Sequence, residues 1–314
     1  MRNNTMVREF TLLGFTDSRR VEISLFTLLL GMYFLTIMWN TVIITITLVN
    51  QQLKIPMYFF LRHFAVLEIG FTSTVLPKAL GNMANGQQTI SLPGCFLQLY
   101  LYLSVGTTEF LMLSVMSIDR YVAICNPLRY STIMNHQTCS LLVLFSWAGG
   151  FLLMMAPAIT LFQLSFCGPH AIDHFFCDIE PLIKLACGDT SLLELIFLLS
   201  AILCLLGTLA INIVTYTIII FTVLCIPSTT RRQKAFSTCA SHIIVISITY
   251  GSCIVMYIKP RGTDEFAFTK GVALLNTVVS PLLNPFVYCL RNKQFQDALK
   301  AGFKALVGFS RTRE

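Results

Sequence analysis

Charged residues are scarce in this chain. Asp, Glu, Lys and Arg make up only 12% of its 314 residues, whereas hydrophobic residues make up 55% and the mean hydropathy is +0.72. A soluble domain usually carries about a quarter charged residues. The polar residues are too few to cover a globule in water. The composition therefore excludes the ordinary soluble classes and predicts that lipid surrounds most of the chain.

Three further absences narrow the function. The polar start, residues 1–20, shows no cleavable signal peptide, so we expect the first apolar helix to act as its own insertion signal. We find no metal-ligand cluster, nucleophile elbow or phosphate loop, and we therefore predict that the protein is not an enzyme. No inverted repeat is visible and intramembrane charge is low, which disfavours a transporter or channel.

Seven segments are apolar and long enough to cross a bilayer. A span needs roughly 20 apolar residues, and it must be helical because lipid offers the backbone no hydrogen bonds. The segments cover about residues 23–49, 57–83, 92–125, 139–162, 194–225, 236–258 and 269–290. We therefore predict an all-α fold, a seven-transmembrane helix bundle over residues 23–291. The second, third and seventh spans carry acids, asparagines or prolines and should be the most enclosed by protein.

The distribution of Lys and Arg predicts that the N-terminus is extracellular and the C-terminus cytoplasmic. Residues 1–22 then form an extracellular N-terminus, in which Asn3 begins a glycosylation sequon. A long loop, residues 163–193, also lies outside. Residues 292–314 form a cytoplasmic segment in which apolar side chains recur every three or four positions from Phe295 onward, between lysines. This spacing predicts a short amphipathic helix on the inner leaflet.

Two motifs lie at the inner ends of spans and have mechanistic interpretations. Asp119-Arg120-Tyr121 ends the third span, where a neighbouring acid and base can form a switchable ion pair; an interfacial anchor is the alternative. Near the end of the seventh span, Pro281–Tyr288 contains two prolines that bend the helix, and Asn284 can bridge the backbone groups they leave unbonded. A plain proline kink is the alternative there.

Two more motifs open spans, and together the four point to a family. Pro56–Leu61 begins the second span, where proline fits the first helical turn, and the basic, hydroxyl-rich run Lys234–His242 begins the sixth. With the loop cysteines Cys167, Cys177 and Cys187, these motifs resemble a class A (rhodopsin-like) G-protein-coupled receptor, and within that class an olfactory (odorant) receptor. The resemblance runs in order over nearly the whole chain.

The chain departs from the family pattern at a few positions. Trp39 stands where the family usually has Gly before the first-span Asn40. Ser117 and Ile118 replace the usual Ala and Tyr, and Glu68 replaces the usual Asp. These departures concern local packing and basal activity, not the resemblance itself.

The resemblance implies a site for small, mostly apolar odorants in the outer half of the bundle. The residues it assigns to this site are Tyr102, Leu103, Gly106, Thr107, Tyr250, Cys253, Tyr257 and Thr277. It further implies that agonists favour an outward movement of the sixth span, which admits a stimulatory olfactory-type G protein of the cAMP pathway. The residues it assigns to coupling and switching are Asp119, Arg120, Tyr121, Lys234, Asn284, Pro285 and Tyr288.

The resemblance also implies two disulfides, Cys95–Cys177 and Cys167–Cys187, although the sequence alone leaves other pairings open. It places Glu68 and Glu109 beside Asn40 and Asn284 as a sodium or proton site. The alternative is two buried carboxyls that are simply protonated or hydrogen-bonded. We expect no other cofactor, and we expect the protein in the plasma membrane.

Several alternatives stay open at this stage. His174, Cys177 and Asp178 have a spacing that a metal site could use, but a disulfide at Cys177 is favoured. Lys259 and Arg261 could anchor a carboxylate ligand, although solvated loop charges are favoured. The rival functions are a class A receptor for a non-odorant small ligand and, less favoured, a small-solute transporter.

Overall fold

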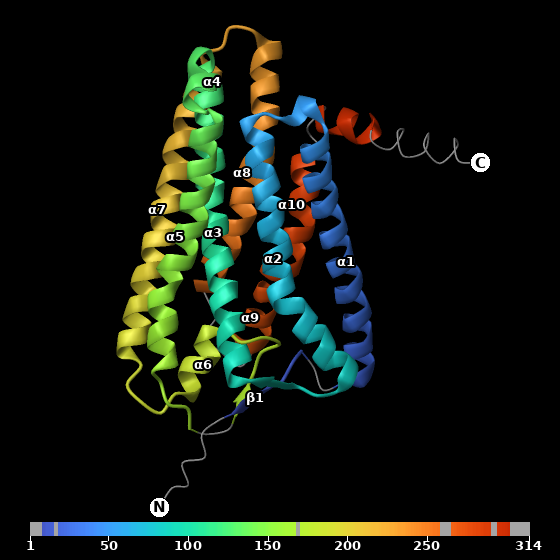
Figure 1. Ribbon diagram of the computed structural model, residues 1–314, viewed down its shortest axis with the longest axis vertical. Coiled ribbons are helices and arrows are strands. Elements are labelled where there is room, and N and C mark those ends of the chain that lie inside the picture. Colours follow the sequence, from blue (N-terminus) through green and yellow to red (C-terminus); the bar gives the residue numbers. More distant parts are fainter. Residues whose placement is uncertain (1–7, 16–17, 168–169, 258–264, 290–293, 302–314) are drawn as a thin grey trace, which may run out of the picture.

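Seven long helical segments form a bundle in the computed structural model, which describes residues 8–15, 18–167, 170–257, 265–289 and 294–301 (Figure 1). A few side chains inside these ranges are also outside the description. The first six spans are α1 (Arg19–Val49), α2 (Pro56–Asn85), α3 (Leu92–Cys125), α5 (His136–Phe162), α7 (Ser191–Leu224) and α8 (Thr229–Tyr257). The seventh consists of α9 (Glu265–Leu274), a π-helical turn (Leu275–Val279) and α10 (Ser280–Cys289).

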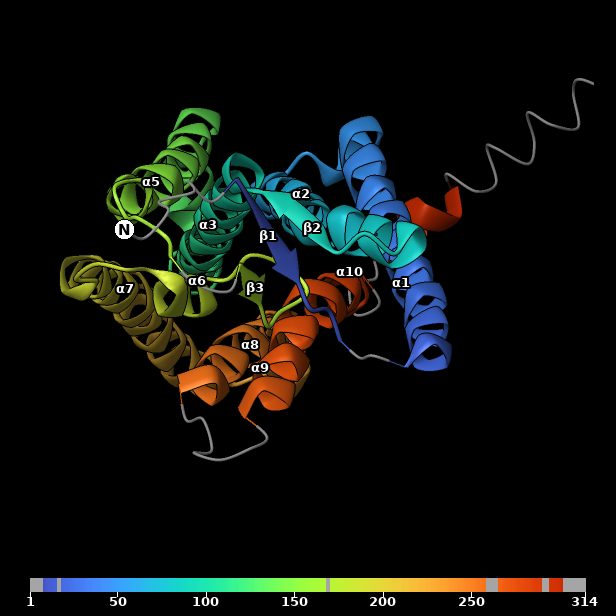
Figure 2. The same ribbon diagram turned by 90° about the horizontal axis from the view of Figure 1, so that it is seen from below.

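The helices differ in how much protein surrounds them. In the most apolar stretch of α2 and of α3, 56% of the residues are buried, compared with 11% in α1 and 22% in α7. Figure 2 shows α1 and α7 at the edges of the bundle. The prediction that the acid-bearing second and third spans are enclosed is confirmed. The large apolar side chains exposed on α1, α5 and α7 face outward, as expected for surfaces that contact lipid.

Local signals set the helix ends. Gly86 takes the left-handed conformation (φ +66°) that ends α2. Ser91 caps α3 by accepting from the Gly94 amide at 3.3 Å, and Asn135 caps α5 by accepting from the Thr138 amide at 2.9 Å. The sixth span was predicted from residue 236, but α8 begins two turns earlier, at Thr229. The prediction began too late because hydropathy marks only the part of a helix that lies in lipid, whereas the first two turns of α8 are polar.

A small β-sheet adds to the predicted all-α fold. Strand β1 (Glu9–Leu12) lies between β2 (Thr89–Ser91), with which it is antiparallel, and β3 (Ala171–Ile172), with which it is parallel. Part of the predicted N-terminal segment, residues 1–22, is thus a strand, and the first span, predicted from about residue 23, begins at Arg19. Phe10 and Leu12 alternate with Thr11 and are each only 1% exposed, so one face of the strand is buried.

Two disulfides hold the long loop at this end of the bundle. Cys95, near the start of α3, is bonded to Cys177, and Cys167 is bonded to Cys187. These are the two predicted pairs. The short helix α6 (Ile179–Leu185) lies between Cys177 and Cys187, and Asp178 caps it by accepting from the Ile179 amide at 2.7 Å. We call this end of the bundle, with β1–β3 and α6, the sheet end.

The opposite end carries α4 (Tyr130–Ile133), the 3-10 turns Gln51–Leu53 and Pro127–Arg129, and a helix over residues 294–301 (Figure 1). We call it the α4 end. Phe295 of the last helix is 2% exposed and packs near Tyr58 of α2, with ring centroids 6.5 Å apart. The predicted amphipathic helix is thus present up to residue 301, and its remaining apolar positions lie outside the described residues. Because β1 and this helix lie at opposite ends, the chain crosses the bundle an odd number of times.

Candidate functional site

A cavity of about 410 Å³ opens between α3, α5, α7, α8 and the seventh span toward the sheet end. One face of α3 forms much of its wall, through Tyr102, Leu103, Gly106, Thr107 and, one turn further, Phe110. Spacings of three and four residues place these side chains on the same side of the helix. Its volume suits a small organic molecule, for which pockets usually measure roughly 300–1,000 Å³.

The wall of the cavity is largely aromatic and apolar. Phe71 of α2 stacks on Tyr102 with ring centroids 4.9 Å apart, and Tyr102 contacts Phe176 of the loop at 4.8 Å. A side chain on Gly106 would approach the Phe71 ring to 3.3 Å, so glycine there preserves the width of the cavity. Further lining residues are Met154, Ile179, Phe197, Ala201, Cys204, Leu205, Thr249 and Cys253.

Five of the eight residues predicted for the ligand site line this cavity, namely Tyr102, Leu103, Gly106, Thr107 and Cys253. Tyr250 is 5% exposed and lies behind the wall, where its ring meets Phe110 edge-on at 5.0 Å. The side chain of Tyr257 lies outside the described residues.

The expectation for Thr277 needs correction. It is fully buried, and its hydroxyl donates to the Ala273 carbonyl at 2.8 Å within its own helix. The seventh span instead lines the cavity with Asn276 and Ser280. The π-helical turn over Leu275–Val279 explains the difference, because a wider turn rotates side chains away from their α-helical directions.

Other lining residues were missed by sequence reasoning. Phe110 was within reach of it, because it lies one turn beyond Gly106 on the predicted face of α3. Asp178, Ile179 and Glu180 close the cavity toward the sheet end, and no periodic signal in the long loop indicated that it would fold back over the bundle. That placement depends on the disulfide from Cys177 to Cys95.

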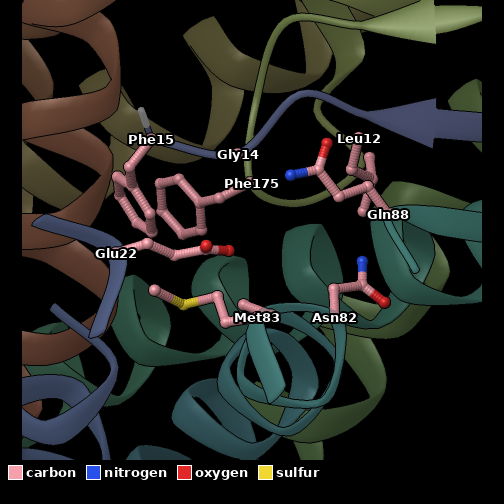
Figure 3. Close-up of a pocket in the computed structure, with 9 residues that line it drawn as sticks. Leu12, Gly14, Phe15, Glu22, Asn82, Met83, Gln88 and Phe175 are labelled. Atoms are coloured by element: carbon pink, nitrogen blue, oxygen red, sulfur yellow. The ribbon is translucent and has the colours of Figure 1, made fainter. Parts of the chain in front are cut away.

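A second, much smaller cavity of about 20 Å³ lies at the sheet end between β1, α1 and α2 (Figure 3). Phe15 stacks on Phe175 there at 4.4 Å, and Glu22 faces the gap while accepting from Arg19 at 2.8 Å. Its size admits about one water molecule. This gap therefore belongs to the packing of the N-terminal segment and is too small for an organic ligand.

A polar network lies on the side of the aromatic wall that faces the α4 end. The Tyr250 hydroxyl donates to Thr208 Oγ1 at 2.6 Å and accepts from the Asn212 amide at 3.1 Å. Asn212 also reaches Ser114 of α3 at 3.4 Å. The network joins α3, α7 and α8 on the α4 side of the cavity, so a displacement of a side chain in the cavity wall can alter contacts of all three helices.

Glu68 and Glu109, the predicted ion site, are both buried, at 1% and 8% exposure. Asn284 donates to Glu68, and Asn40 donates to the Pro281 carbonyl at 3.4 Å, which brings α1, α2 and α10 together as expected. Glu109 lies closer to the sheet end and lines the cavity. One carboxyl oxygen of Glu109 and the amide oxygen of Asn284 have no hydrogen-bond partner.

The predicted switch lies near the α4 end of α3. Arg120 forms an ion pair with Asp119, and its Nε donates to the carboxylate at 3.0 Å. The Tyr130 hydroxyl of α4 donates to the other carboxylate oxygen at 2.7 Å. Asp119 is 1% exposed, so this acid is fully enclosed by its two partners. Tyr121 is partly buried between two apolar clusters.

Contacts between α7 and α8 complete this end. The Tyr216 hydroxyl is hydrogen-bonded to His242 Nδ1, and both side chains are buried. Pro285 lies inside α10, as the motif predicted. Lys234 and Tyr288 lie on described helices, but their side chains are outside the description. The outcome for Asn3, Lys259 and Arg261 also lies outside the described residues.

The loop histidine does not have the environment of a metal ligand. The sulfur of Cys177 is in a disulfide, and His174 is 1% exposed between Phe175 and Phe176. Burial, together with the nearby Lys270 ammonium, lowers the pKa of His174 to about 3. Lys270 itself pairs with Asp173 at 2.6 Å and so ties the seventh span to the loop.

Comparison with known proteins decides the family. The sequence profile described as "Olfactory receptor" matches residues 29–305. The chain belongs to the olfactory receptor family. Human Olfactory receptor 6C74 is 52% identical over 310 residues, which cover 99% of each chain, and mouse Olfactory receptor 6E1 is 52% identical over 316 residues, 99% of this chain and 100% of the mouse protein.

The fold agrees with this assignment. The crystal structure of squid rhodopsin superposes with a TM-score of 0.73 at 15% identity, over 93% of this chain and 83% of the rhodopsin. The olfactory receptor is thus a multi-pass membrane protein of the G-protein-coupled receptor class, not an enzyme. Its family implies a small-molecule odorant as ligand and a G protein as partner.

Proposed function

We propose that this olfactory receptor binds small, mostly apolar organic molecules in the 410 Å³ cavity and activates a stimulatory heterotrimeric G protein of the cAMP pathway. The observation that carries the proposal is the position of α3, which lines the cavity at Tyr102 and ends at the ion pair of Arg120. These two residues are 18 positions apart, about 27 Å along one rigid helix. The sheet end faces outward and the α4 end faces the cytosol, in the plasma membrane.

The mechanism is a population shift. In the resting arrangement the Tyr216–His242 hydrogen bond joins α7 to α8 near the α4 end, and the Thr215–Ser117 hydrogen bond at 3.1 Å joins α7 to α3. The ion pair, which lies within α3, keeps Arg120 on Asp119. A ligand that contacts α3 and α8 in the cavity favours a second arrangement, in which the α4 end of α8 moves outward. The C-terminal helix of a G-protein α subunit then contacts Arg120, Lys234 and the end of α10.

We also propose that a sodium ion binds beside Glu68 and Glu109 and stabilises the resting arrangement. The two unpartnered buried oxygens, on Glu109 and Asn284, support it, because carboxylate and amide oxygens suit a hard cation. Bound sodium would supply the positive charge that the two buried carboxyls lack.

The test of coupling is a cAMP reporter screen of chemically diverse volatiles with the wild type and Arg120→Ala. We expect agonist responses in the wild type that disappear in the variant, although both reach the cell surface. Arg129→Ala is the matched control, because Arg129 lies at the same end of the bundle but outside the ion pair. A response that persists in Arg120→Ala would refute the assigned coupling site.

A further inference from the structure

Basic side chains gather around one aromatic ring at the α4 end, where α2 and α5 both begin (Figure 1). The guanidinium carbon of Arg62 lies 5.1 Å from the centre of the Phe59 ring, and the His63 ring meets that ring with centroids 4.8 Å apart. His136, the first residue of α5, approaches it from the second helix at 6.0 Å. We call Arg62, His63 and His136 the basic cluster.

The basic cluster has no acidic partner in the described part of the chain. Arg62 forms no ion pair there. Of the described acids at this end, Asp119 is enclosed by its own two partners, and Asp297 lies exposed on the last helix. Neighbouring basic groups disfavour one another's charged forms, and an anion among them removes that cost. The side chains of the cluster are partly or well exposed, so such an anion can reach them from outside the bundle.

The position of the cluster along α2 is that of a lipid headgroup layer. The 30 residues of α2 measure about 45 Å, whereas the hydrocarbon core of a bilayer is about 30 Å thick. A helix centred on this core therefore extends beyond it by roughly 7 Å at each end. Arg62 lies six residues after Pro56, roughly 9 Å along the helix, at the boundary between hydrocarbon and headgroups.

An apolar surface continues from the cluster toward the middle of the membrane. Val66 follows Arg62 by one turn on α2 and is 40% exposed. On α5, Leu141 and Leu144 lie beyond His136 and are 50% and 60% exposed. Basic groups at headgroup level followed by exposed apolar side chains match the two parts of one phospholipid, its anionic headgroup and its acyl chain.

The donors of the cluster favour a particular headgroup. A guanidinium binds two oxygens of a phosphate through parallel N–H groups, and each imidazole can donate one more N–H. A phosphate diester has only two unesterified oxygens, which the arginine alone would occupy. A phosphate monoester has three such oxygens and a charge of about −1.5 to −2, and so can accept from the histidines as well.

We propose that the basic cluster binds the phosphate monoester of a phosphoinositide in the cytoplasmic leaflet, with an acyl chain of the lipid on the apolar surface of α2 and α5. The proposal goes beyond the proposed function and rests only on its orientation, in which the α4 end faces the cytosol. The cytoplasmic leaflet is the one that carries anionic lipids, and basic groups between helices on that side suit their headgroups.

The test measures lipid binding to the purified receptor in detergent by native mass spectrometry. Phosphatidylinositol 4-phosphate is compared with cardiolipin, whose two phosphates are both diesters, and with phosphatidylcholine. We expect phosphatidylinositol 4-phosphate to bind about tenfold more tightly than cardiolipin, because only its monoester satisfies the histidines. Soluble inositol 1,4-bisphosphate should compete weakly, since it lacks the acyl chains. Equal affinity for the two lipids, or equal affinity of the soluble headgroup, would overturn the proposal.

Variants locate the binding site. We expect Arg62→Gln to abolish the preference for phosphatidylinositol 4-phosphate and Arg62→Lys, which keeps the charge without the fork, to retain part of it. Arg129→Gln is the matched control, because it removes the same charge from an exposed position at the same end, outside the cluster.

His136→Gln, at an exposed position, should weaken binding severalfold and serves if Arg62→Gln does not fold. An equal loss in Arg62→Gln and Arg129→Gln would show attraction by net charge alone and would refute the site. The assay uses neither odorant nor G protein, so its failure leaves the proposed function untouched.

Discussion

Gly150 marks the closest approach of α3 and α5, and its substitution gives a sharp test of the fold. A Cβ atom at this position would lie 2.0 Å from Thr108 Oγ1, 2.8 Å from the Ser104 carbonyl oxygen and 2.9 Å from the Thr108 amide nitrogen. The hydroxyl could rotate away, but the other two atoms are backbone. Gly150→Ala must therefore push the two helices apart, and we expect it to destabilise the receptor.

The magnitude follows from two opposing effects. Inserting a methyl group into a filled contact costs about 1–3 kcal/mol. Replacing Gly by Ala inside a helix gains up to about 1 kcal/mol. Gly207→Ala is the matched control, because Gly207 lies on α7 with no atom within 4 Å of its Cβ position and should show the gain alone. The variants should differ by about 1–3 kcal/mol.

Thermal unfolding of the purified receptor in detergent measures this difference. Trp147 lies three residues before Gly150 on α5 and reports it by intrinsic fluorescence. We expect the midpoint of Gly150→Ala to fall several degrees below that of Gly207→Ala, at roughly 2–4 °C per kcal/mol. Adding Thr108→Ala should recover only part, since both backbone contacts remain. Equal midpoints for the two glycine variants would refute the close approach.

Two further predictions concern the α4 end and the loop. Asp119→Asn removes the negative charge that holds Arg120. If this change lowers the preference for the resting arrangement by about 1.4 kcal/mol, the active population and the basal cAMP level rise roughly tenfold. The control Asp297→Asn, at an exposed position, should leave basal cAMP unchanged. His174 stays neutral in the folded loop because burial holds its pKa near 3, but an unfolded loop gains the proton below pH 6.5. Stability present above pH 6.5 is therefore lost as pH falls toward 3, by about 2 kcal/mol at pH 5. His174→Phe should show a smaller drop between pH 7.5 and 5 in thermal unfolding, and an unchanged drop would contradict this origin.

Much of the bundle was predictable from the sequence because its physical cause is local. Long apolar runs predicted every span, and the acids in the second and third spans indicated which helices would be enclosed. The family resemblance, and not helical periodicity, assigned Tyr102, Gly106 and Thr107 to the ligand site. The inferences about the spans depend on composition within one segment.

The parts that were missed depend on contacts between distant segments. The strand Glu9–Leu12 exists because residues 89–91 and 171–172 offer it backbone partners, and no short polar segment reveals such partners in advance. The π-helical turn that replaces Thr277 by Asn276 and Ser280 in the cavity has no sequence signal that we can identify. Asp178 and Glu180 reach the cavity because the loop folds inward, where the Cys95–Cys177 disulfide and the Lys270–Asp173 ion pair hold it.

The helices also differ in the kind of contact that holds them to their neighbours, and this difference bears on which helix can move. Backbone atoms of α3 lie so close to Gly150 of α5 that a single methyl group would not fit, which makes this pair rigid. The described polar contacts of α8 with its neighbours, in contrast, run through side-chain tips at Tyr250 and His242. Hydrogen bonds of this kind contribute about 1 kcal/mol each and can be exchanged for others, whereas a close backbone contact cannot slide without opening a void. In the mechanism proposed above, a ligand that alters the wall beside Tyr250 would therefore act on a helix whose described polar contacts can be exchanged, while α3 would stay fixed against α5 and the movement would expose Arg120.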